Sequence, residues 1–115
     1  MTRTAVESVA TRELIRRHPT NPILTADDFP DIVNAVFNPG ATLLDSGETL
    51  LLLRVEDRTG RSRLVVATSP DGRSNWTLFP DRCIEPDGSY AEHWGVEDPR
   101  ISRIDDMWVI VYTGY

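Results

Sequence analysis

The residues best suited to chemistry in this sequence lie in one segment, His93–Arg100, which reads HWGVEDPR. Cleavage of a glycosidic bond needs a carboxylic acid near the leaving-group oxygen, and the sugar platform is often aromatic. Desolvation by Trp94, or the adjacent carboxylate of Glu97, would raise the pKa of Asp98 and keep this acid protonated. Pro99 would stiffen the backbone directly after the acid. These properties make Asp98 the candidate catalytic acid.

Composition alone leaves a simpler interpretation open for the same segment. The acidic pair and the proline would form a solvated turn, and Arg100 would pair with the acids. Acidic turns that contain proline are common in proteins. On composition alone this turn is the favoured interpretation.

Two further positions carry groups that bind hydroxyls. The Asn38 amide offers both a donor and an acceptor, although Asn-Pro-Gly at 38–40 is also an ordinary turn. Arg54 follows four leucines at 50–53. Such an arginine either caps a strand at the surface, which is the commoner case, or projects into a polar cavity and holds an acid or a sugar hydroxyl.

The elements that must position these residues are predicted to be short β-strands. From Ala41 onward, apolar runs alternate with turn signals. The predicted strands cover 41–44, 49–55, 62–68 and 76–79, then 100–104 and 107–113. Four antiparallel strands over roughly 40 residues match one blade of a β-propeller, so the sequence predicts an all-β fold of about one and a half blades. Pro80 is expected to stop the fourth strand.

Two regions are expected to behave as separate domains. Residues 1–20 are predicted to form a helical segment, because apolar residues recur at helical spacing over 5–17 before the prolines at 19 and 22. Residues 21–115 would form a truncated part of a propeller catalytic domain, since 108–115 has the composition of a core strand without a polar tail. The alternative fold is a self-contained β-sandwich or meander of about six strands with an N-terminal helix.

Composition excludes several classes of protein. The formal net charge is −6, which argues against a nucleic-acid or anionic-membrane partner. A single cysteine excludes an internal disulfide. The two histidines lie far apart and have no cysteine spacing beside them, so we expect no metal site. The N-terminus lacks the apolar stretch of a signal peptide, which favours a cytoplasmic location.

Four elements, in this order, resemble glycoside hydrolase family 130, the family of β-mannoside phosphorylases and some related β-mannoside hydrolases. They are NPIL at 21–24, VFNPG at 36–40, LRVE at 53–56 and GVEDPR at 95–100, the last followed by 101–115. The order and spacing are more specific than any one element. The resemblance spans 21–115 and corresponds to the N-terminal part of a family domain.

The resemblance implies a five-bladed β-propeller with its active site in the central channel. Asp98 matches the proton donor of the family, and Asn38 and Arg54 match residues that contact the sugar. Glu97 and Arg100 belong to the same motif and are further substrate-binding candidates. No cofactor is implied beyond inorganic phosphate as co-substrate. The residues that hold phosphate in the family lie in later blades.

We therefore expect a glycoside phosphorylase that cleaves β-mannosides with inversion and releases mannose 1-phosphate. One alternative is a β-mannoside hydrolase of the same family, which would need a second carboxylate to activate water. Others are an inactive fragment, a non-catalytic carbohydrate-binding β module and a small β interaction module. An oligosaccharide is the expected partner. A homo-oligomer is compatible with the family, although no residue pattern indicates one.

Overall fold

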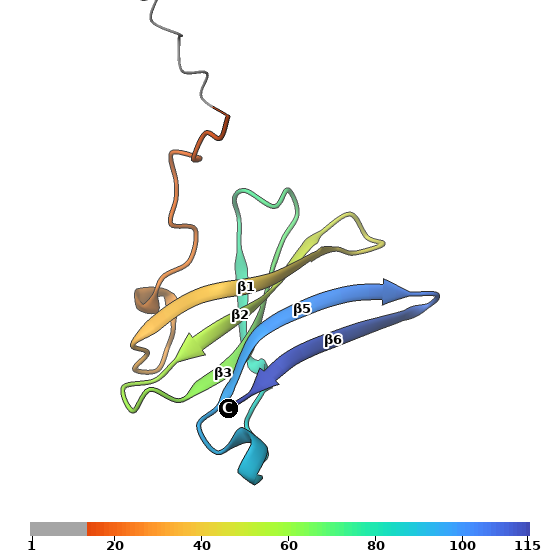
Figure 1. Ribbon diagram of the computed structural model, residues 1–115. Coiled ribbons are helices and arrows are strands. Elements are labelled where there is room, and N and C mark those ends of the chain that lie inside the picture. The colour runs from red at the N-terminus through yellow and green to blue at the C-terminus, as the bar shows by residue number, and fades with distance from the viewer. Residues whose placement is uncertain (1–13) are drawn as a thin grey trace, which may run out of the picture.

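The computed structural model describes residues 14–115, and this part of the chain is built from β-strands and two single-turn 3-10 helices (Figure 1). The elements are η1 (Ala26–Asp28), β1 (Ala35–Leu43), β2 (Thr49–Glu56), β3 (Ser62–Ser69), β4 (Thr77–Ile84), η2 (Tyr90–Glu92), β5 (Val96–Ile104) and β6 (Met107–Gly114). The strands β1 to β4 form one antiparallel sheet in chain order, and β5 pairs with β6 in a second sheet.

The predicted strand order and most of the predicted turns are confirmed. Gly47 and Gly60 take φ angles of 86° and 82° in the turns that join β1 to β2 and β2 to β3. Glycine adopts these left-handed angles without the steric cost that a side chain would bring. The four strands of the first sheet follow one another as the strands of a propeller blade do.

Three strand boundaries differ from the prediction. β1 begins at Ala35 and β5 at Val96, so both predicted proline turns lie inside strands. β4 continues past Pro80 to Ile84, because the chain leaves the pairing register after Phe79 and rejoins it at Cys83. A bulge of this kind places the proline where no ladder hydrogen bond is required.

The apolar run of β2 is buried on both faces of its sheet. Leu51, Leu53 and Val55 pack on one face with Phe29 and Val65. The partly buried Ile23, Leu24 and Val33, which precede β1, cover this face. Successive strand residues point to opposite faces, so Leu52 and Arg54 must face the other way.

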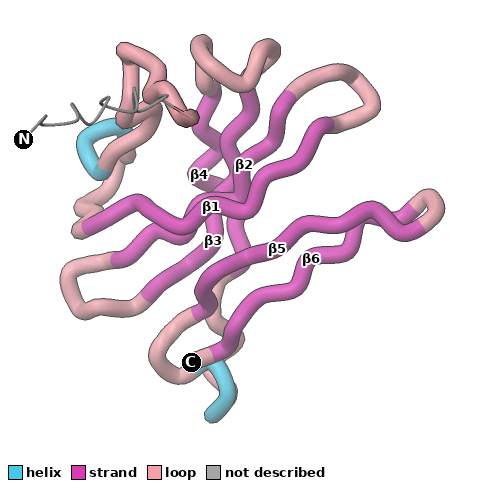
Figure 2. The backbone as a smooth tube through the Cα atoms, turned by 45° about the horizontal axis from the view of Figure 1, so that its top comes forward, coloured by secondary structure: helices cyan, strands magenta, loops and turns pink. Residues whose placement is uncertain are grey.

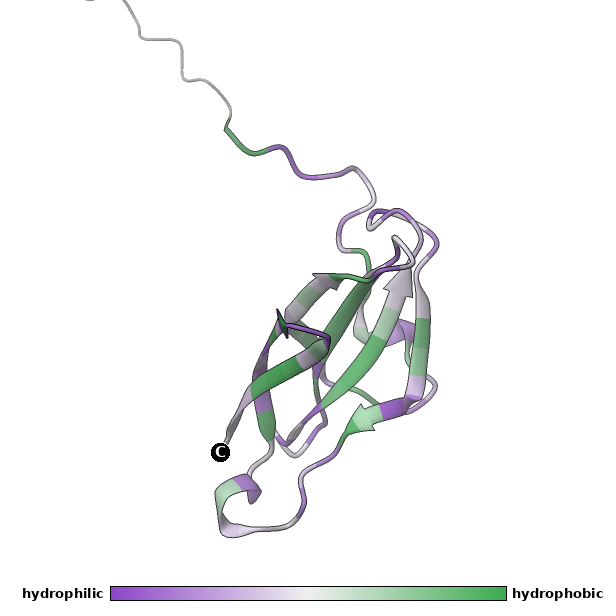
Figure 3. Cartoon of the chain, turned by 90° about the vertical axis from the view of Figure 1, so that its right-hand side faces the viewer, coloured by the Kyte–Doolittle hydropathy of each residue, from purple (hydrophilic) through white to green (hydrophobic). Residues whose placement is uncertain are grey.

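That other face is covered by β5. Val96 on β5 packs with Leu52 and Leu64 in a second apolar cluster, and all three side chains are buried. Figures 1 and 2 both show β5 running beside β1 along the four-stranded sheet. The colouring of Figure 3 shows that most of the apolar segments lie on the strands. The first strands of the two sheets are therefore neighbours.

The two ends of the described chain differ from expectation. Residues 14–17, the last part of the predicted helix, have no regular structure, and 5–13 lie outside the described residues. The composition of β6 predicts a core strand, but all of its side chains except that of Val109 are exposed, because β5 is the only described strand that pairs with it.

Candidate active site

Asn38 and Asp98 occupy the same kind of position in neighbouring strands. In β1, residues 38 and 39, between the paired residues Phe37 and Gly40, lie opposite the single residue Leu53 of β2. In β5, residues 98 and 99, between Glu97 and Arg100, lie opposite the single residue Tyr112 of β6 in the same way. Such β-bulges bend a strand and redirect a side chain. We call these two insertions the paired bulges.

The backbone of each bulge depends on its first residue. Asn38 and Asp98 have φ angles of 44° and 48°, in the left-handed region. Asn and Asp are the residues other than glycine that adopt this conformation most readily. Each is followed by proline, whose missing N–H is tolerated in a strand at a bulge. The sequences Asn-Pro and Asp-Pro thus encode bulges here, rather than the turns that they usually indicate.

The paired bulges lie in direct contact. A Cβ atom placed on Gly40 would lie only 2.8 Å from the carbonyl oxygen of Pro99, so the backbones approach more closely than any side chain would allow. At this short separation, Nδ2 of Asn38 donates a hydrogen bond of 3.0 Å to Oδ1 of Asp98. Two residues separated by 60 positions in the sequence are thus joined.

Arg54 enters the same site from β2. Its side chain is 13% exposed, and each of its three nitrogens donates to a different side chain. Nη2 lies 2.7 Å from Oε1 of Glu97, Nη1 lies 3.2 Å from Oδ1 of Asp98, and Nε lies 3.0 Å from Oγ of Ser62. Surface capping is therefore the wrong interpretation of Arg54, since the arginine projects between the sheets and pairs with two carboxylates.

An aromatic ring supports the guanidinium from β1. Phe37 is the cross-strand partner of Arg54, and the Cζ atom of the arginine lies 4.5 Å from the centre of the phenyl ring. The face of an aromatic ring attracts a cation at this distance. The guanidinium is consequently held by a ring and by three hydrogen-bonded side chains.

The charge state of Asp98 differs from the expectation. The hydrogen bond from Asn38 lowers the pKa of Asp98 below its usual value, and the hydrogen bond and positive charge of Arg54 and the charge of Arg100 lower it further. Desolvation acts in the opposite direction but is outweighed. Trp94, expected to desolvate the acid, instead packs edge to face against His93, with 5.0 Å between the ring centres. Asp98 is therefore a carboxylate at neutral pH in the substrate-free chain.

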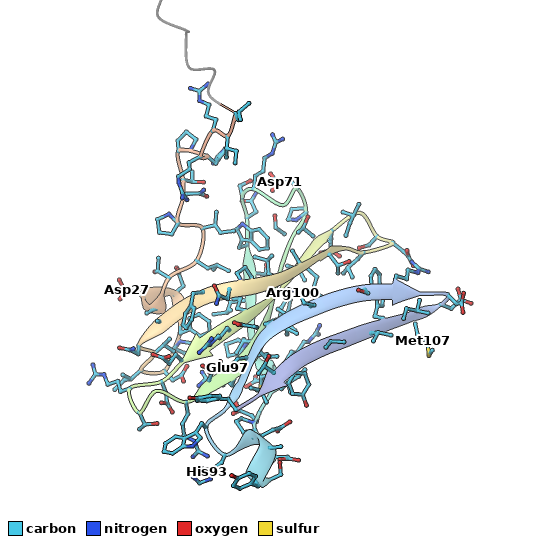
Figure 4. The ribbon with its side chains drawn as sticks, in the orientation of Figure 1. Asp27, Asp71, His93, Glu97, Arg100 and Met107 are labelled. Atoms are coloured by element: carbon cyan, nitrogen blue, oxygen red, sulfur yellow. The ribbon has the colours of Figure 1, made fainter. Side chains whose placement is uncertain are left out.

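Arg100 has a different role from that of Arg54. Its Nη1 lies 2.9 Å from the carbonyl oxygen of Pro99 and 3.4 Å from that of Asp98, so it supports the bulge that carries the acid. It also lines a groove of about 440 Å³ together with Asn38 and Ser102. Figure 4 shows Glu97 and Arg100 on β5 beside the four-stranded sheet, whereas His93 lies in the loop that precedes the strand.

The structure thus brings together the five residues singled out in the sequence and adds two that were missed. Asn38, Arg54, Glu97 and Asp98 are linked by hydrogen bonds, and Arg100 braces the backbone beside them. The missed residues are Phe37 and Ser62. The alternation of β2 and β3 could have indicated Ser62, because it lies on the same face of the paired strands as Arg54. Phe37 could not be found in this way, because β1 was predicted to begin only at Ala41.

Within 14–115 the structure places no group of three or more His, Cys, Asp or Glu side chains where they could share a metal ion. None of the helices in this range is long and apolar enough to cross a membrane.

The described residues thus form two packed antiparallel sheets with a cluster of hydrogen-bonded polar side chains between them. A family model for glycoside hydrolase family 130, described as beta-1,4-mannooligosaccharide phosphorylase, matches residues 10–115. The chain belongs to this family, and its fold is that of part of a five-bladed β-propeller.

Two individual proteins are also similar to the chain. A 1,2-beta-oligomannan phosphorylase from Thermoanaerobacter sp. (strain X514) is 36% identical over 88 residues, which cover 70% of this chain and 29% of that protein. The crystal structure of a glycosyl hydrolase from Bacteroides ovatus matches with a TM-score of 0.70 and 31% identity, over 87% of this chain and 34% of that chain. The chain therefore spans about a third of the length of these relatives.

Proposed function

We propose that this chain supplies the proton-donating part of the active site of a glycoside phosphorylase that acts on β-mannosides. The observation that carries the proposal is the placement of Asp98. Its carboxylate stands on a bulge between Asn38 and Arg54, and its side chain is still 40% exposed and so accessible to a ligand. Membership of family 130 supports glycoside chemistry at this position.

In the proposed reaction an oxygen of inorganic phosphate attacks the anomeric carbon of the terminal mannose. The bond between that carbon and the glycosidic oxygen breaks, and its electron pair goes to the oxygen. That oxygen receives a proton originating from Asp98, passed through a hydroxyl of the sugar. The products are mannose 1-phosphate with inverted configuration and a mannoside shortened by one unit.

The residues around Asp98 have distinct proposed roles. Asn38 and Arg54 hold the carboxylate and offer N–H groups to hydroxyls of the sugar, and Glu97 and Arg100 complete the binding cluster. A bound sugar would cover the exposed carboxylate of Asp98 and exclude water. Desolvation raises the pKa of a carboxyl group, so substrate binding would favour the protonated form that a donor requires.

A β-mannoside hydrolase is the second candidate, because the Bacteroides ovatus protein that the chain resembles is described as a glycosyl hydrolase. The two candidates differ only in the group that attacks the anomeric carbon. A hydrolase needs a second carboxylate to activate water, whereas a phosphorylase needs a cationic site for phosphate. The linkage is equally open to test, since the family model and the Thermoanaerobacter relative are described with 1,4 and 1,2 linkages.

The test is an assay of the complete enzyme that carries this chain, on β-1,2- and β-1,4-mannooligosaccharides with and without phosphate. We expect phosphate-dependent release of mannose 1-phosphate, which Asp98→Asn reduces by a factor of at least about 100, the range of general acid catalysis. Asp105→Asn is the matched control, because Asp105 is an exposed aspartate with a similar φ of 52° in the turn after β5.

Each outcome of this assay has a definite meaning. Release of free mannose at the same rate without phosphate would show that the enzyme is a hydrolase and not a phosphorylase. A wild-type rate in Asp98→Asn would show that Asp98 is not the proton donor. Binding of mannosides without any turnover would support a non-catalytic carbohydrate-binding module instead.

A further inference from the structure

Within residues 14–115, the hydroxyl of Ser62 is the only hydrogen-bond partner of the Arg54 side chain that is not a carboxylate. Ser62 is the first residue of β3 and is 1% exposed. Its Oγ accepts a hydrogen bond of 3.0 Å from Nε of Arg54. Nε is the nitrogen at the base of the guanidinium plane, so a partner there fixes the direction in which the outer nitrogens point.

We propose that Ser62 is a positioning residue that orients the guanidinium of Arg54 towards the carboxylates of Glu97 and Asp98. The inference rests on the proposed function, because it assigns Ser62 a role in the same site. Ser62 acts through Arg54 and does not itself touch Asp98.

The geometry of the sheet explains how Ser62 reaches Arg54. On β3, the direct cross-strand partner of Arg54 is Leu64, and Ser62 lies two residues away on the same face. Diagonal neighbours of this kind lie within reach of a long side chain. Arg54 therefore extends along the sheet towards the start of β3, where β5 approaches.

Ser62 is itself held in place by the loop before β5. Gly95 forms an isolated parallel bridge with Ser62. A Cβ atom on Gly95 would lie 2.6 Å from the nitrogen of Ser62 and 2.8 Å from its oxygen, so no other residue fits without displacing the serine. Gly95 precedes Glu97 and Asp98 by only two and three positions. The serine is thus clamped by the segment that carries both acids.

The test is a titration of Asp98 in Ser62→Ala, measured by NMR of the aspartate carboxyl carbons in the complete enzyme. Asp98 faces Asn38 on β1, Arg54 on β2, and Glu97 and Arg100 on its own strand. With Nε released, Arg54 spends less time against Asp98, and we expect the pKa of Asp98 to rise. In the activity assay kcat should fall about 10-fold, as for the loss of one hydrogen bond to a charged group, and KM should change less.

Ser69→Ala is the matched control for a merely structural effect. Ser69 is also a buried serine on β3, at the opposite end of the strand, where its hydroxyl bonds with Asp71 and Ser74. We expect Ser69→Ala to lower the unfolding temperature without moving the pKa of Asp98 or the ratio of kcat to KM.

A double-mutant cycle with Arg54→Lys provides the decisive comparison. Lysine has no Nε–H equivalent, so Ser62→Ala should change neither pKa nor kcat further in that background. An unchanged pKa of Asp98 in Ser62→Ala, or an equal effect in both backgrounds, overturns the inference. The titration does not depend on turnover. An enzyme inactive on mannosides would refute the proposed function while the pKa still tests Ser62.

Discussion

At the scale of single residues, the site depends on which groups share the Asp98 carboxylate. Both Asn38 and Arg54 donate to the same oxygen, Oδ1. Among the described residues, no side chain donates to the other oxygen, Oδ2. This oxygen is therefore available to a ligand. A carboxylate held through one oxygen keeps a fixed orientation while its second oxygen can exchange a proton.

The amide of Asn38 gives the largest contribution to the lowered pKa of Asp98, and this leads to a first prediction. Asn38→Asp keeps a residue that tolerates the left-handed backbone but replaces the amide donor by a second carboxylate. We expect the pKa of Asp98 to rise, because like charges in contact disfavour ionisation. NMR titration of the carboxyl carbons measures the change.

The control for this prediction is Asn75→Asp. Asn75 is exposed and has a comparable φ of 51°, but it lies in the segment before β4. We expect this variant to leave the titration of Asp98 unchanged. A pKa of Asp98 that falls in Asn38→Asp would contradict the arrangement described above.

At the scale of elements, the paired bulges decide where the functional side chains point. Each bulge inserts one extra residue, so the residues beyond it would otherwise face the opposite side of the sheet. Their close contact requires Gly40, whose Cα faces the carbonyl of Pro99. This contact sets the distance between β1 and β5 at the level of Asp98.

Gly40→Ala tests this contact between the bulges. The added methyl group would have to displace backbone atoms, since Pro99 O lies 2.8 Å and Pro99 C lies 3.2 Å from the Cβ position. We expect a loss of about 1–3 kcal/mol in the free energy of unfolding, as for overpacking, together with a reduced kcat. Chemical denaturation and the phosphorolysis assay measure the two effects.

Gly88→Ala separates this steric effect from a general cost of replacing glycine. Gly88 has a φ of 80° and open space around its Cβ position, so its replacement strains the backbone without touching the bulges. We expect lower stability with an unchanged kcat. If Gly40→Ala folded and reacted like the wild type, β1 and β5 could not be as close as described.

The strands were predictable from the sequence, but the bulges were not. Alternation and turn residues are local signals, and they identify β2, β3 and the hairpin of β5 and β6. Asn-Pro-Gly and Asp-Pro-Arg give the same local signal as turns. Only the pairing of β1 with β2, and of β5 with β6, turns these segments into bulges, and pairing is a long-range property.

The charge state of the candidate acid was unpredictable for the same reason. Sequence proximity suggested Trp94 and Glu97 as the groups that set the pKa of Asp98. The residues whose hydrogen bonds lower this pKa most are Asn38 and Arg54, which are remote from Asp98 in the sequence. The resemblance to the family nevertheless pointed to both residues, because it matches Asn38 and Arg54 to residues of the same site as Asp98.

At the scale of the whole molecule, the site lies between two sheets, so its geometry depends on how they pack. The apolar part of this contact is a small cluster, in which Leu64 and Val96 are fully buried and Leu52 is 2% exposed. The polar cluster of Arg54 and the two acids lies beside it. Packing of β5 against the sheet is therefore coupled to the orientation of Asp98.

Leu64→Ala tests this coupling. Truncation of a fully buried leucine leaves a cavity, and we expect a loss of about 2–5 kcal/mol in the free energy of unfolding. Amide hydrogen exchange should show weaker protection in β5 and β6, because the cluster anchors this hairpin. Leu43→Ala on β1 serves as control, since Leu43 is 65% exposed and should cost little. Unchanged exchange in the hairpin would show that other contacts anchor it.

The repetition of one bulge in β1 and β5 has a consequence for how such a protein changes over evolutionary time. When a repeat unit that contains such a bulge is duplicated, the bulge and the position of its polar side chain are duplicated with it. Asn38 and Asp98 are each the first residue of one of the paired bulges, and their side chains differ only in ending in an amide or an acid. A change of a single codon letter is therefore enough to exchange a neutral amide for an ionisable carboxyl group at a position where the backbone already accepts both.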